Sequence, residues 1–384
     1  MRTLVYGAGP LGSWMAARLH EAGVEVSLLA RGQRLEDLRA HGVVLEDARS
    51  GAHEVHHVPA VSHLRPKDRY DLILVVMRKD QCEAILPALA GNAHATTVLF
   101  VQNNAEGFDR YRALLGSDRV MAGFPSAGGQ RADPVMRIMP VPSVPLPIGE
   151  ADGGITDRTR AVAALLDRMR DKRVQVRDDM DAWLVTHVPL IMNHLGVYAA
   201  ALDAERFART RDARLLGVRA AREALAAQQA AGIPIRPSWF RVIRVVPEAL
   251  LVAQLRAMAR TTLYEVGVIA HAGAAREEMA HLIKEFRQRR RAAAVGRGRG
   301  VGRGGGSAGR KHCGAPTAGA SMTWMLGPSS AQAERPRRTR AGAAPSQGSC
   351  YRKSDAPPDV SQPSRRGTAA CAHPGRPRRG RRRR

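Results

Sequence analysis

Three glycines near the start of the chain have the type and spacing to bind a phosphate group. A GxGxxG motif spans residues 7–12, directly after the short apolar run Thr3–Tyr6 and before a stretch with helical periodicity. Gly7 would permit a tight turn, Gly9 would let the backbone approach a pyrophosphate, and Gly12 would let the helix pack against the strand. The motif therefore predicts a dinucleotide site; the alternative is a glycine-rich turn without a ligand.

The residue after the second apolar run indicates which dinucleotide would fit. NAD-specific sites place an Asp or Glu about 20 residues beyond the glycines, where it binds the ribose hydroxyls. Here the run Val24–Ala30 is followed by Arg31. A guanidinium suits the 2′-phosphate of NADP and cannot replace the missing acid. We therefore predict NADP as the cofactor, with Arg31 on its 2′-phosphate; otherwise Arg31 is a solvated loop residue.

These sites require strands that alternate with helices, and residues 1–150 have that pattern. The first helix would place Leu11, Met15 and Leu19 on one face and end near Gly23. Pro10 and Leu11 of the glycine motif are predicted to belong to the phosphate site. Further apolar runs cover residues 43–45, 72–77, 97–101 and 120–123. Alternation of this kind implies a parallel sheet with right-handed crossovers. We expect a Rossmann-type α/β domain over residues 1–150, completed by short strands and loops after residue 123.

The second half of the chain has a different character. Residues 157–172, 180–202, 205–232 and 245–290 are rich in Ala, Leu and Arg with few β-branched residues, which favours helices. Residues 232–234, Gly-Ile-Pro, break this pattern once. We expect an all-α domain over residues 157–290 that binds substrate or mediates dimerisation.

The positive charge of the chain is concentrated at its C-terminal end. The net charge is +25, of which residues 291–384 carry +18. This segment lacks apolar periodicity and is dominated by Arg, Gly, Pro, Ser and Ala, so we predict a disordered basic tail. An RGG-like nucleic-acid arm and a membrane-surface tether are two functional interpretations. We favour an unselected extension and do not expect the tail to bind nucleic acid.

Cysteine usage and hydropathy exclude several other classes. Only Cys82 precedes residue 291, and the four cysteines show no CxxC spacing, so neither a disulfide framework nor a metal site is predicted. The N-terminus enters a strand without a signal-peptide pattern, and no apolar run is long enough to span a bilayer. We expect a cytoplasmic protein that does not associate with membranes; a homodimer is left open.

Four segments together resemble one known family. Besides the glycine motif they are Val75–Gln81 at the end of the fourth strand, the Asn-containing loop Gln102–Gly107, and Ile148–Glu150 near the end of the first domain. With the helical second half, they are similar to the ketopantoate reductase family (2-dehydropantoate 2-reductases) over most of residues 1–285. The resemblance implies that NADPH reduces a 2-keto acid, 2-dehydropantoate or a related substrate, in a cleft between the domains. It would place the protein in pantothenate biosynthesis.

The resemblance also implies roles for two residues that follow strands. Arg78, with Lys79 beside it, matches the basic residue that helps to hold the cofactor phosphates. Asn103 matches the asparagine near the nicotinamide and the substrate. Independently, both positions lie at the carboxyl ends of predicted parallel strands, where such sheets bind ligands. The alternative for Asn103 is an ordinary turn residue, since Asn tolerates positive φ.

The chain departs from the family where the catalytic lysine is expected. Alignment on Trp183 and Asn193 puts Val185 at the lysine position and Pro189 at the first of two asparagines, which leaves only Asn193. Hydride addition to a ketone produces an alkoxide that must be protonated or stabilised, and valine does neither. His187 is a candidate proton donor with a suitable intrinsic pKa, as is His194, although a structural role is favoured for each.

The resemblance extends to one carboxylate of the helical half. Glu265 occupies the place of the family's substrate-binding glutamate, and Ala253 stands where a serine is expected. We therefore expect Asn193 and Glu265 to contact the substrate; the alternative for Glu265 is a solvated helix residue. Two functions follow: an NADPH-dependent oxidoreductase acting on a 2-keto acid, or an NADP-binding protein that has lost catalysis and acts as a sensor or partner.

Overall fold

The computed structural model describes the backbone of residues 1–300 and the side chains of residues 1–293. The first domain is built on an eight-stranded sheet in the order β12-β11-β8-β7-β6-β1-β2-β5. Its strands are β1 (Thr3–Tyr6), β2 (Val26–Leu29), β5 (Ala60–Val61), β6 (Leu72–Val75), β7 (Thr97–Val101), β8 (Val120–Gly123), β11 (Leu146–Glu150) and β12 (Val174–Val176). All neighbours run parallel except β11 and β8. The predicted parallel α/β sheet is confirmed.

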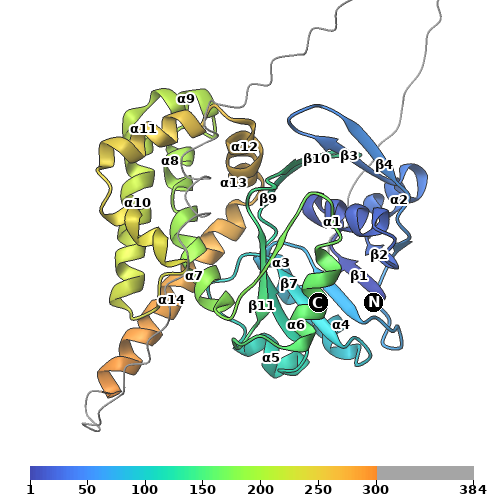
Figure 1. The fold of residues 1–384 in the computed structure, drawn as a ribbon. Coiled ribbons are helices and arrows are strands. Elements are labelled where there is room, and N and C mark those ends of the chain that lie inside the picture. The colour runs from blue at the N-terminus through green and yellow to red at the C-terminus, as the bar shows by residue number, and fades with distance from the viewer. Residues whose placement is uncertain (301–384) are drawn as a thin grey trace, which may run out of the picture. The chain divides into compact units, whose positions relative to one another are not determined.

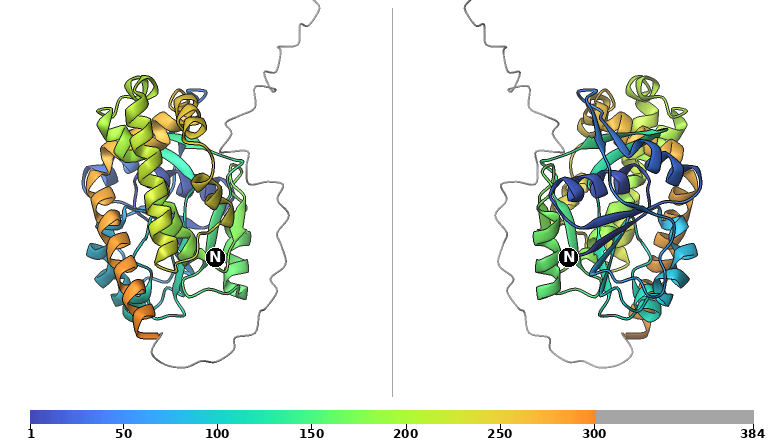
Figure 2. Two further views of the ribbon diagram at one scale, coloured as in Figure 1. Left: turned by 90° about the vertical axis from the view of Figure 1, so that its left-hand side faces the viewer. Right: turned by 90° about the vertical axis from the view of Figure 1, so that its right-hand side faces the viewer.

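Both faces of this sheet are covered, as its near-continuous apolar strands require. The helices are α1 (Pro10–Glu21), α2 (Gln33–His41), α3 (Lys79–Cys82), η1 (Glu83–Ile85), α4 (Leu86–Gly91), α5 (Asp109–Leu115) and α6 (Asp157–Leu166). One apolar core lies under α1 and α6, and a second lies under α4 and α5. The right-hand view of Figure 2 shows α1 crossing the front of the sheet. The first helix begins at Pro10, inside the glycine motif, and ends shortly before Gly23.

The first domain is longer than the sequence indicates. We expected the helix that starts at residue 157 to open the helical domain, but α6 packs on the sheet, where Val162 and Leu166 are fully buried in the same core as α1. The strand β12 then pairs with β11 at the sheet edge. The sheet domain therefore extends to about residue 176, because the apolar face of α6 matches the sheet.

A small second sheet joins the two halves of the described chain. It has the order β4-β3-β10-β9, with strands β3 (Val43–Asp47), β4 (His53–His56), β9 (Ala127–Ala132) and β10 (Val135–Pro140). A Cβ on Gly129 would lie 2.8 Å from Pro10, and one on Gly128 would lie 2.8 Å from Gly267 of the helical half. Glycines in β9 therefore let this strand touch the start of α1 and the helical domain at once.

The helical domain consists of shorter helices than expected. They are α7 (Met180–Ile191), α8 (His194–Ala199), α9 (Ala204–Arg209), α10 (Arg211–Ala230), η2 (Ser238–Arg244), α11 (Glu248–Met258), α12 (Thr262–Tyr264), η3 (Glu265–Ile269), α13 (Ala270–Ala274) and α14 (Arg276–Gly300). The predicted helix over 180–202 is interrupted after Ile191, two residues beyond Pro189. The break at Gly232 is confirmed, with φ +72° at that residue.

Two helices organise this domain. α10 packs against α7, α8 and α11, as the left-hand view of Figure 2 shows. α14 packs against α7 and against α3 of the first domain (Figure 1). It continues to Gly300, beyond the boundary predicted at residue 290. The rest of the predicted tail, residues 301–384, lies outside the described residues. None of the helices that the structure describes is long and apolar enough to cross a membrane.

Candidate functional site

The glycine motif forms a tight turn between β1 and α1. Gly7 has φ +122°, and a Cβ there would lie 2.4 Å from the carbonyl oxygen of Val76. A Cβ on Gly12 would lie 1.9 Å from the carbonyl oxygen of Gly7. These two glycines therefore allow α1 and the end of β6 to close on the turn, as their spacing predicts.

The N-terminus of α1 opens from this turn. Gly9 is the N-cap, no side chain caps the helix, and Pro10 follows at the first helical position. A Cβ on Gly9 would meet no atom within 4 Å. Uncapped amides at a helix start attract anions. The open side of Gly9 therefore fits a pyrophosphate that approaches the backbone.

Two arginines after β2 relate to the turn in different ways. Arg31 is exposed and donates a hydrogen bond of 2.6 Å to the hydroxyl of Tyr6, the last residue of β1. Arg34 is buried and donates to the carbonyl oxygen of Ala8, inside the glycine motif, at 3.3 Å. Arg31 thus presents a cation to solvent at the edge of the site, whereas Arg34 supports the turn from behind.

Arg78 and Asn103 emerge at the same edge of the sheet, because β6 and β7 are parallel neighbours. Arg78 is partly buried, and its Nη1 donates to the carbonyl oxygen of Ala274 at 2.6 Å. Asn103 is buried, and its Nδ2 donates to Oε1 of Glu278 at 3.3 Å. The structure therefore brings both predicted residues to the edge that faces the helical domain.

Glu278, in the first turn of α14, closes this edge. It is 1% exposed, and its Oε1 also accepts the backbone N–H of Lys79 at 3.2 Å. Its Oε2 has no hydrogen-bond partner in the described part of the chain, and the same is true of Oδ1 of Asn103 and Oδ1 of Asp80. Buried polar atoms normally find partners. Three such oxygens at one edge mark a place where a polar ligand with hydrogen-bond donors would be stabilised.

Histidines of the helical domain lie beside this carboxylate. Nε2 of His271 is 3.8 Å from Oε2 of Glu278, and its ring is 6.2 Å from that of His194. His187 stacks on Trp183. Burial lowers the pKa of His187 to about 4 and that of His194 to about 3. Burial also lowers the pKa of His271, against the opposing effect of Glu278. All three are therefore neutral at pH 7 in the protein without ligand.

Asn193 and Glu265 do not join this group. Asn193 lies inside the helical domain, where its Nδ2 donates to the hydroxyl of Tyr264 at 2.7 Å and its side chain faces Gly217. The side chain of Glu265 is 56% exposed and pairs with Arg137 of β10 at 3.4 Å. Neither has a hydrogen bond or ion pair with Asn103, so their predicted substrate contacts have no support in this placement.

The break after α7 explains the misplaced asparagine. Helical spacing from Val185 would put Asn193 on the same face two turns later, but α7 ends at Ile191 and α8 begins at His194. Val185 itself is fully buried in an apolar cluster with Ala105 and Met279. The position that matches the family's lysine is therefore part of the core.

The position of Lys79 beside Arg78 predicted that both side chains would face a ligand, but the side chain of Lys79 does not. Its side chain is buried, with Nζ 2.9 Å from the hydroxyl of Tyr111 and 3.3 Å from a carboxylate oxygen of Glu285. Burial opposes its charge, but Tyr111 and Glu285 outweigh that effect and raise the pKa of Lys79. Lys79 therefore anchors α14 to the first domain.

Glu278 and Glu285 were not identified from the sequence. They lie seven residues apart, which places them on one face of α14. Glu285 also accepts the backbone N–H of Ala105, in the loop that follows β7, at 3.2 Å. The sequence does carry one signal for a buried polar contact: these two acids lie on the same helix face as the apolar residues Leu282 and Phe286.

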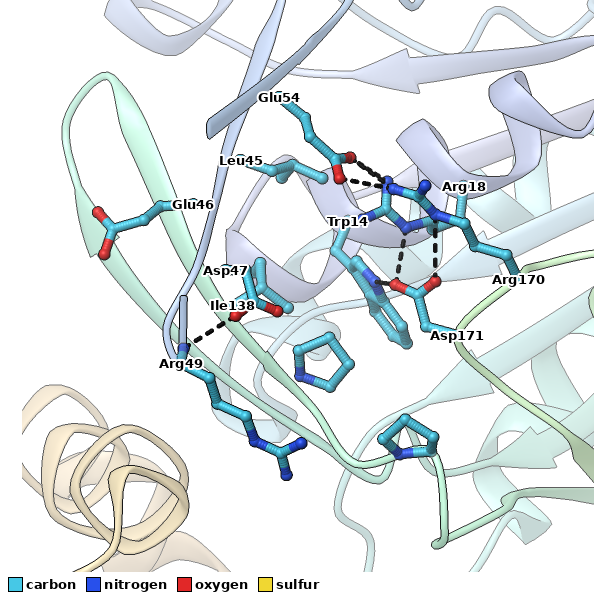
Figure 3. Close-up of a pocket in the computed structure, with 12 residues that line it drawn as sticks. Trp14, Arg18, Leu45, Glu46, Asp47, Arg49, Glu54, Ile138, Arg170 and Asp171 are labelled. Carbon is cyan, nitrogen blue, oxygen red and sulfur yellow. Dashed lines mark hydrogen bonds and ion pairs between the residues drawn. The ribbon is translucent and has the colours of Figure 1, made fainter. Parts of the chain in front are cut away.

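A hollow lies elsewhere in the first domain. It encloses about 270 Å³ beside the second half of α1, and its lining includes Trp14, Arg18, Glu54 and Asp171. In Figure 3 both carboxylates point at Arg18, which bonds Glu54 and Asp171 at 2.7 Å each. The two carboxylates and the guanidinium of Arg18 therefore neutralise one another. The glycine turn does not line this hollow. No group of three or more His, Cys, Asp or Glu residues within the described range could hold a metal ion.

Comparison with known proteins supports the resemblance. Residues 3–137 match the model of the family described as ketopantoate reductase PanE/ApbA. No curated protein matches the chain. The matched range contains the glycine turn, Arg31, Arg78 and Asn103. The resemblance to the ketopantoate reductase family is thereby confirmed, and its sequence part is confined to the first domain.

Solved structures extend the likeness to the helical domain. A 2-dehydropantoate 2-reductase from Methylococcus capsulatus superposes with a TM-score of 0.54 at 18% identity, over 78% of this chain and 97% of that one. A PanE/ApbA family ketopantoate reductase from Ralstonia eutropha JMP134 gives 0.53 at 22% identity, over 76% and 99%. A D-mandelate dehydrogenase solved with NADH and anilino(oxo)acetate gives 0.54 at 13% identity, over 76% and 99%. At these identities the likeness shows a shared two-domain fold, as predicted.

Proposed function

We propose that this chain is a nicotinamide-dependent reductase that uses NADPH to reduce a 2-keto acid, either 2-dehydropantoate or a related compound. The match of residues 3–137 to the ketopantoate reductase family supports the reaction class. The shared fold with a 2-dehydropantoate 2-reductase and an NADH-containing D-mandelate dehydrogenase agrees with it. The single observation that carries the proposal is the uncapped N-terminus of α1 at Gly9, with exposed Arg31 at the end of the neighbouring strand.

The residues of the first domain would share the binding of the cofactor. The amides of Gly9, Leu11 and their neighbours would bind the pyrophosphate, and Arg31 would bind the 2′-phosphate. Arg78, at the end of β6, would add a second cation for the phosphates. The bound cofactor would supply the hydride. Asn103 would hold the nicotinamide and the substrate carbonyl near Glu278, with which it already shares a hydrogen bond.

The proton that neutralises the alkoxide must come from a residue other than Val185. We assign it to His271, because Glu278 lies within reach of both His271 and Asn103 and so positions the two relative to one another. A keto acid carries a carboxylate, and its negative charge together with that of Glu278 would favour the imidazolium form when substrate binds. His271 would then protonate the alkoxide.

Cofactor titration tests the proposal directly. Calorimetry on the full chain should show tighter binding of NADPH than of NADH. Arg31→Gln should weaken NADPH binding about tenfold and leave NADH binding unchanged, since only NADPH carries the 2′-phosphate. Arg39→Gln removes the same charge from an exposed site on α2 and should change neither affinity. Binding of neither dinucleotide by the wild-type chain would end the reductase hypothesis.

A second candidate function is supported by Val185. Because this residue is fully buried among apolar side chains, the chain lacks an ionisable group at the position of the family's lysine. An NADP-binding protein without turnover, acting as a sensor or partner, agrees with that observation. NADPH oxidation with a panel of 2-keto acids separates the two functions: turnover favours the reductase, and tight binding without turnover favours the sensor.

A further inference from the structure

Arg34 is a buried cation that has no ion-pair partner among the described side chains, and it lies directly behind the glycine turn. The residue is 6% exposed, and its guanidinium donates to the carbonyl oxygens of Ala8 and Pro134, each at 3.3 Å, and to Oγ of Ser13 at 3.2 Å. All three acceptors are neutral. Burial lowers the pKa of Arg34 and the nearby charge of Arg131 lowers it further, whereas the carboxylates of Asp37 and Asp133 act in the opposite direction. The guanidinium nevertheless stays protonated, because its intrinsic pKa is far above neutrality.

A buried charge without an ion pair costs free energy. Asp37 and Asp133 act on Arg34 only from beyond ion-pair distance, so its positive charge is incompletely balanced by the described residues. It lies one residue from the open side of Gly9, where a pyrophosphate would bring negative charge. Such a ligand would complete the compensation.

The bond to Ala8 also fixes the direction of one amide. A trans peptide is planar, so its C=O and the following N–H point to opposite sides. Arg34 and Oγ of Ser13, which lies 3.3 Å from the same oxygen, both hold the carbonyl of Ala8. The N–H of Gly9 is thereby turned away from Arg34, out of the turn.

We infer that Arg34 is a positioning residue for the phosphate turn: it holds the Ala8–Gly9 peptide with its N–H toward the ligand, and the pyrophosphate balances its charge. The inference rests on the proposed function and goes beyond it. Arg34 differs from Arg31 in what it recognises. Because NAD and NADP share the pyrophosphate, Arg34 supports both cofactors equally and does not contribute to the choice between them.

The experiment compares three arginine variants of the full chain by calorimetry with NADPH and NADH. Arg34→Gln should weaken both affinities by a similar factor, about tenfold, and leave their ratio unchanged. Arg34→Lys keeps the charge but loses the fork of donors, so it should restore part of both affinities. Arg214→Gln is the matched control. Arg214 is also 6% exposed and, like Arg34, donates only to neutral oxygens, but it lies in the helical domain.

Thermal unfolding of the same variants separates positioning from general stability. Arg214→Gln should lower the melting temperature without changing either affinity. Unchanged affinities in Arg34→Gln would overturn the inference, and so would a loss confined to NADPH, which would make Arg34 a ligand of the 2′-phosphate. If Arg34→Gln does not fold, Arg34→Lys decides: wild-type affinities contradict the inference, and a matched partial loss supports it. Failure of the proposed function shows separately, in the wild-type titrations.

Discussion

At the scale of single residues, one carboxylate organises the candidate catalytic edge. Glu278 receives hydrogen bonds from the side chain of Asn103 and the backbone of Lys79, and it lies beside His271. A buried carboxylate in this setting must be held by donors, because desolvation of its charge is expensive. Two of its contacts come from loops after neighbouring strands and one comes from the helical domain. The geometry of the site therefore depends on how the domains meet.

Replacement of His271 tests its assignment as proton donor. His271→Asn should lower kcat by about 100-fold or more, since general acid catalysis contributes on the order of 10²–10⁴-fold. In the wild-type protein kcat/KM should fall as pH rises through the pKa of His271, which burial places below 6.5. The charged and titratable groups around it are Glu278, Arg78, His194 and His187. The variant should lose this decline, which pH–rate profiles would reveal.

A conservative change at the carboxylate provides the control. Glu278→Gln keeps the shape of the side chain but removes the charge that favours imidazolium, so the decline in kcat/KM should move to lower pH. NADPH affinity should stay close to wild type in both variants. An unaltered pH profile in His271→Asn would show that the proton comes from another group.

The sequence predicts the residues whose roles are set locally. Gly7 and Gly12 have the conformation and packing that the motif requires, and Arg78 and Asn103 lie where parallel strands end. Asn193 was misplaced because helical spacing was extended across a break that the sequence does not mark clearly. The role of Glu278 could not be predicted, because the donors of its two hydrogen bonds, Asn103 and Lys79, lie 175 and 199 residues away in the chain.

At the scale of elements, one buried lysine ties the loop that links β8 to β9 to the loop that links β10 to β11. Nζ of Lys172 donates to the carbonyl oxygens of Ser126, Val141 and Val144 at 2.6–2.8 Å. Ser126 has φ +49°, an uncommon conformation for a side-chain-bearing residue. The lysine therefore fixes the residue that precedes β9, and β9 is the strand that contacts the start of α1. The sequence showed no periodic signal for this contact.

Removal of this ammonium group should destabilise the first domain. Lys172→Met keeps the aliphatic stem but removes the ammonium donor from three carbonyl groups. Within residues 1–300, only that of Val141 keeps a backbone donor, the N–H of Val144, so the variant should lower the free energy of unfolding by about 2–4 kcal/mol. Urea denaturation followed by circular dichroism measures the change. Lys284→Met, at an exposed position on α14, should change it by less than about 0.5 kcal/mol. Equal effects in the two variants would contradict the role of Lys172.

At the scale of the whole molecule, α14 joins the two halves through charges that are paired across the boundary. Glu278 and Glu285 bind loops that follow β6 and β7, and Arg289 pairs with Asp181 of α7. The histidines lie within the same region and are neutral when buried. Acid should therefore weaken the region where the halves meet before it protonates the carboxylates of the surface.

The sign of this effect follows from where His194 binds its proton. Its pKa is about 3 in the folded protein against 6.5 in the unfolded chain, so below pH 6.5 the unfolded chain binds more protons. The free energy of unfolding should fall by about 1.4 kcal/mol for each pH unit between 6.5 and 3 on account of this residue. Glu54, whose pKa is lowered to about 2, contributes stability that is lost only below pH 4.5.

Urea denaturation between pH 6.5 and 5 isolates the histidine contribution, because the carboxylates do not titrate there. His194→Gln cannot gain a proton and should reduce the slope of stability against pH by about 1.4 kcal/mol per unit. His20→Gln removes a histidine that is exposed at the end of α1, and it should leave the slope as it is. The same slope in both variants as in the wild type would contradict this prediction. The acid sensitivity would then originate outside the buried histidines, and acid would not weaken the boundary between the domains first.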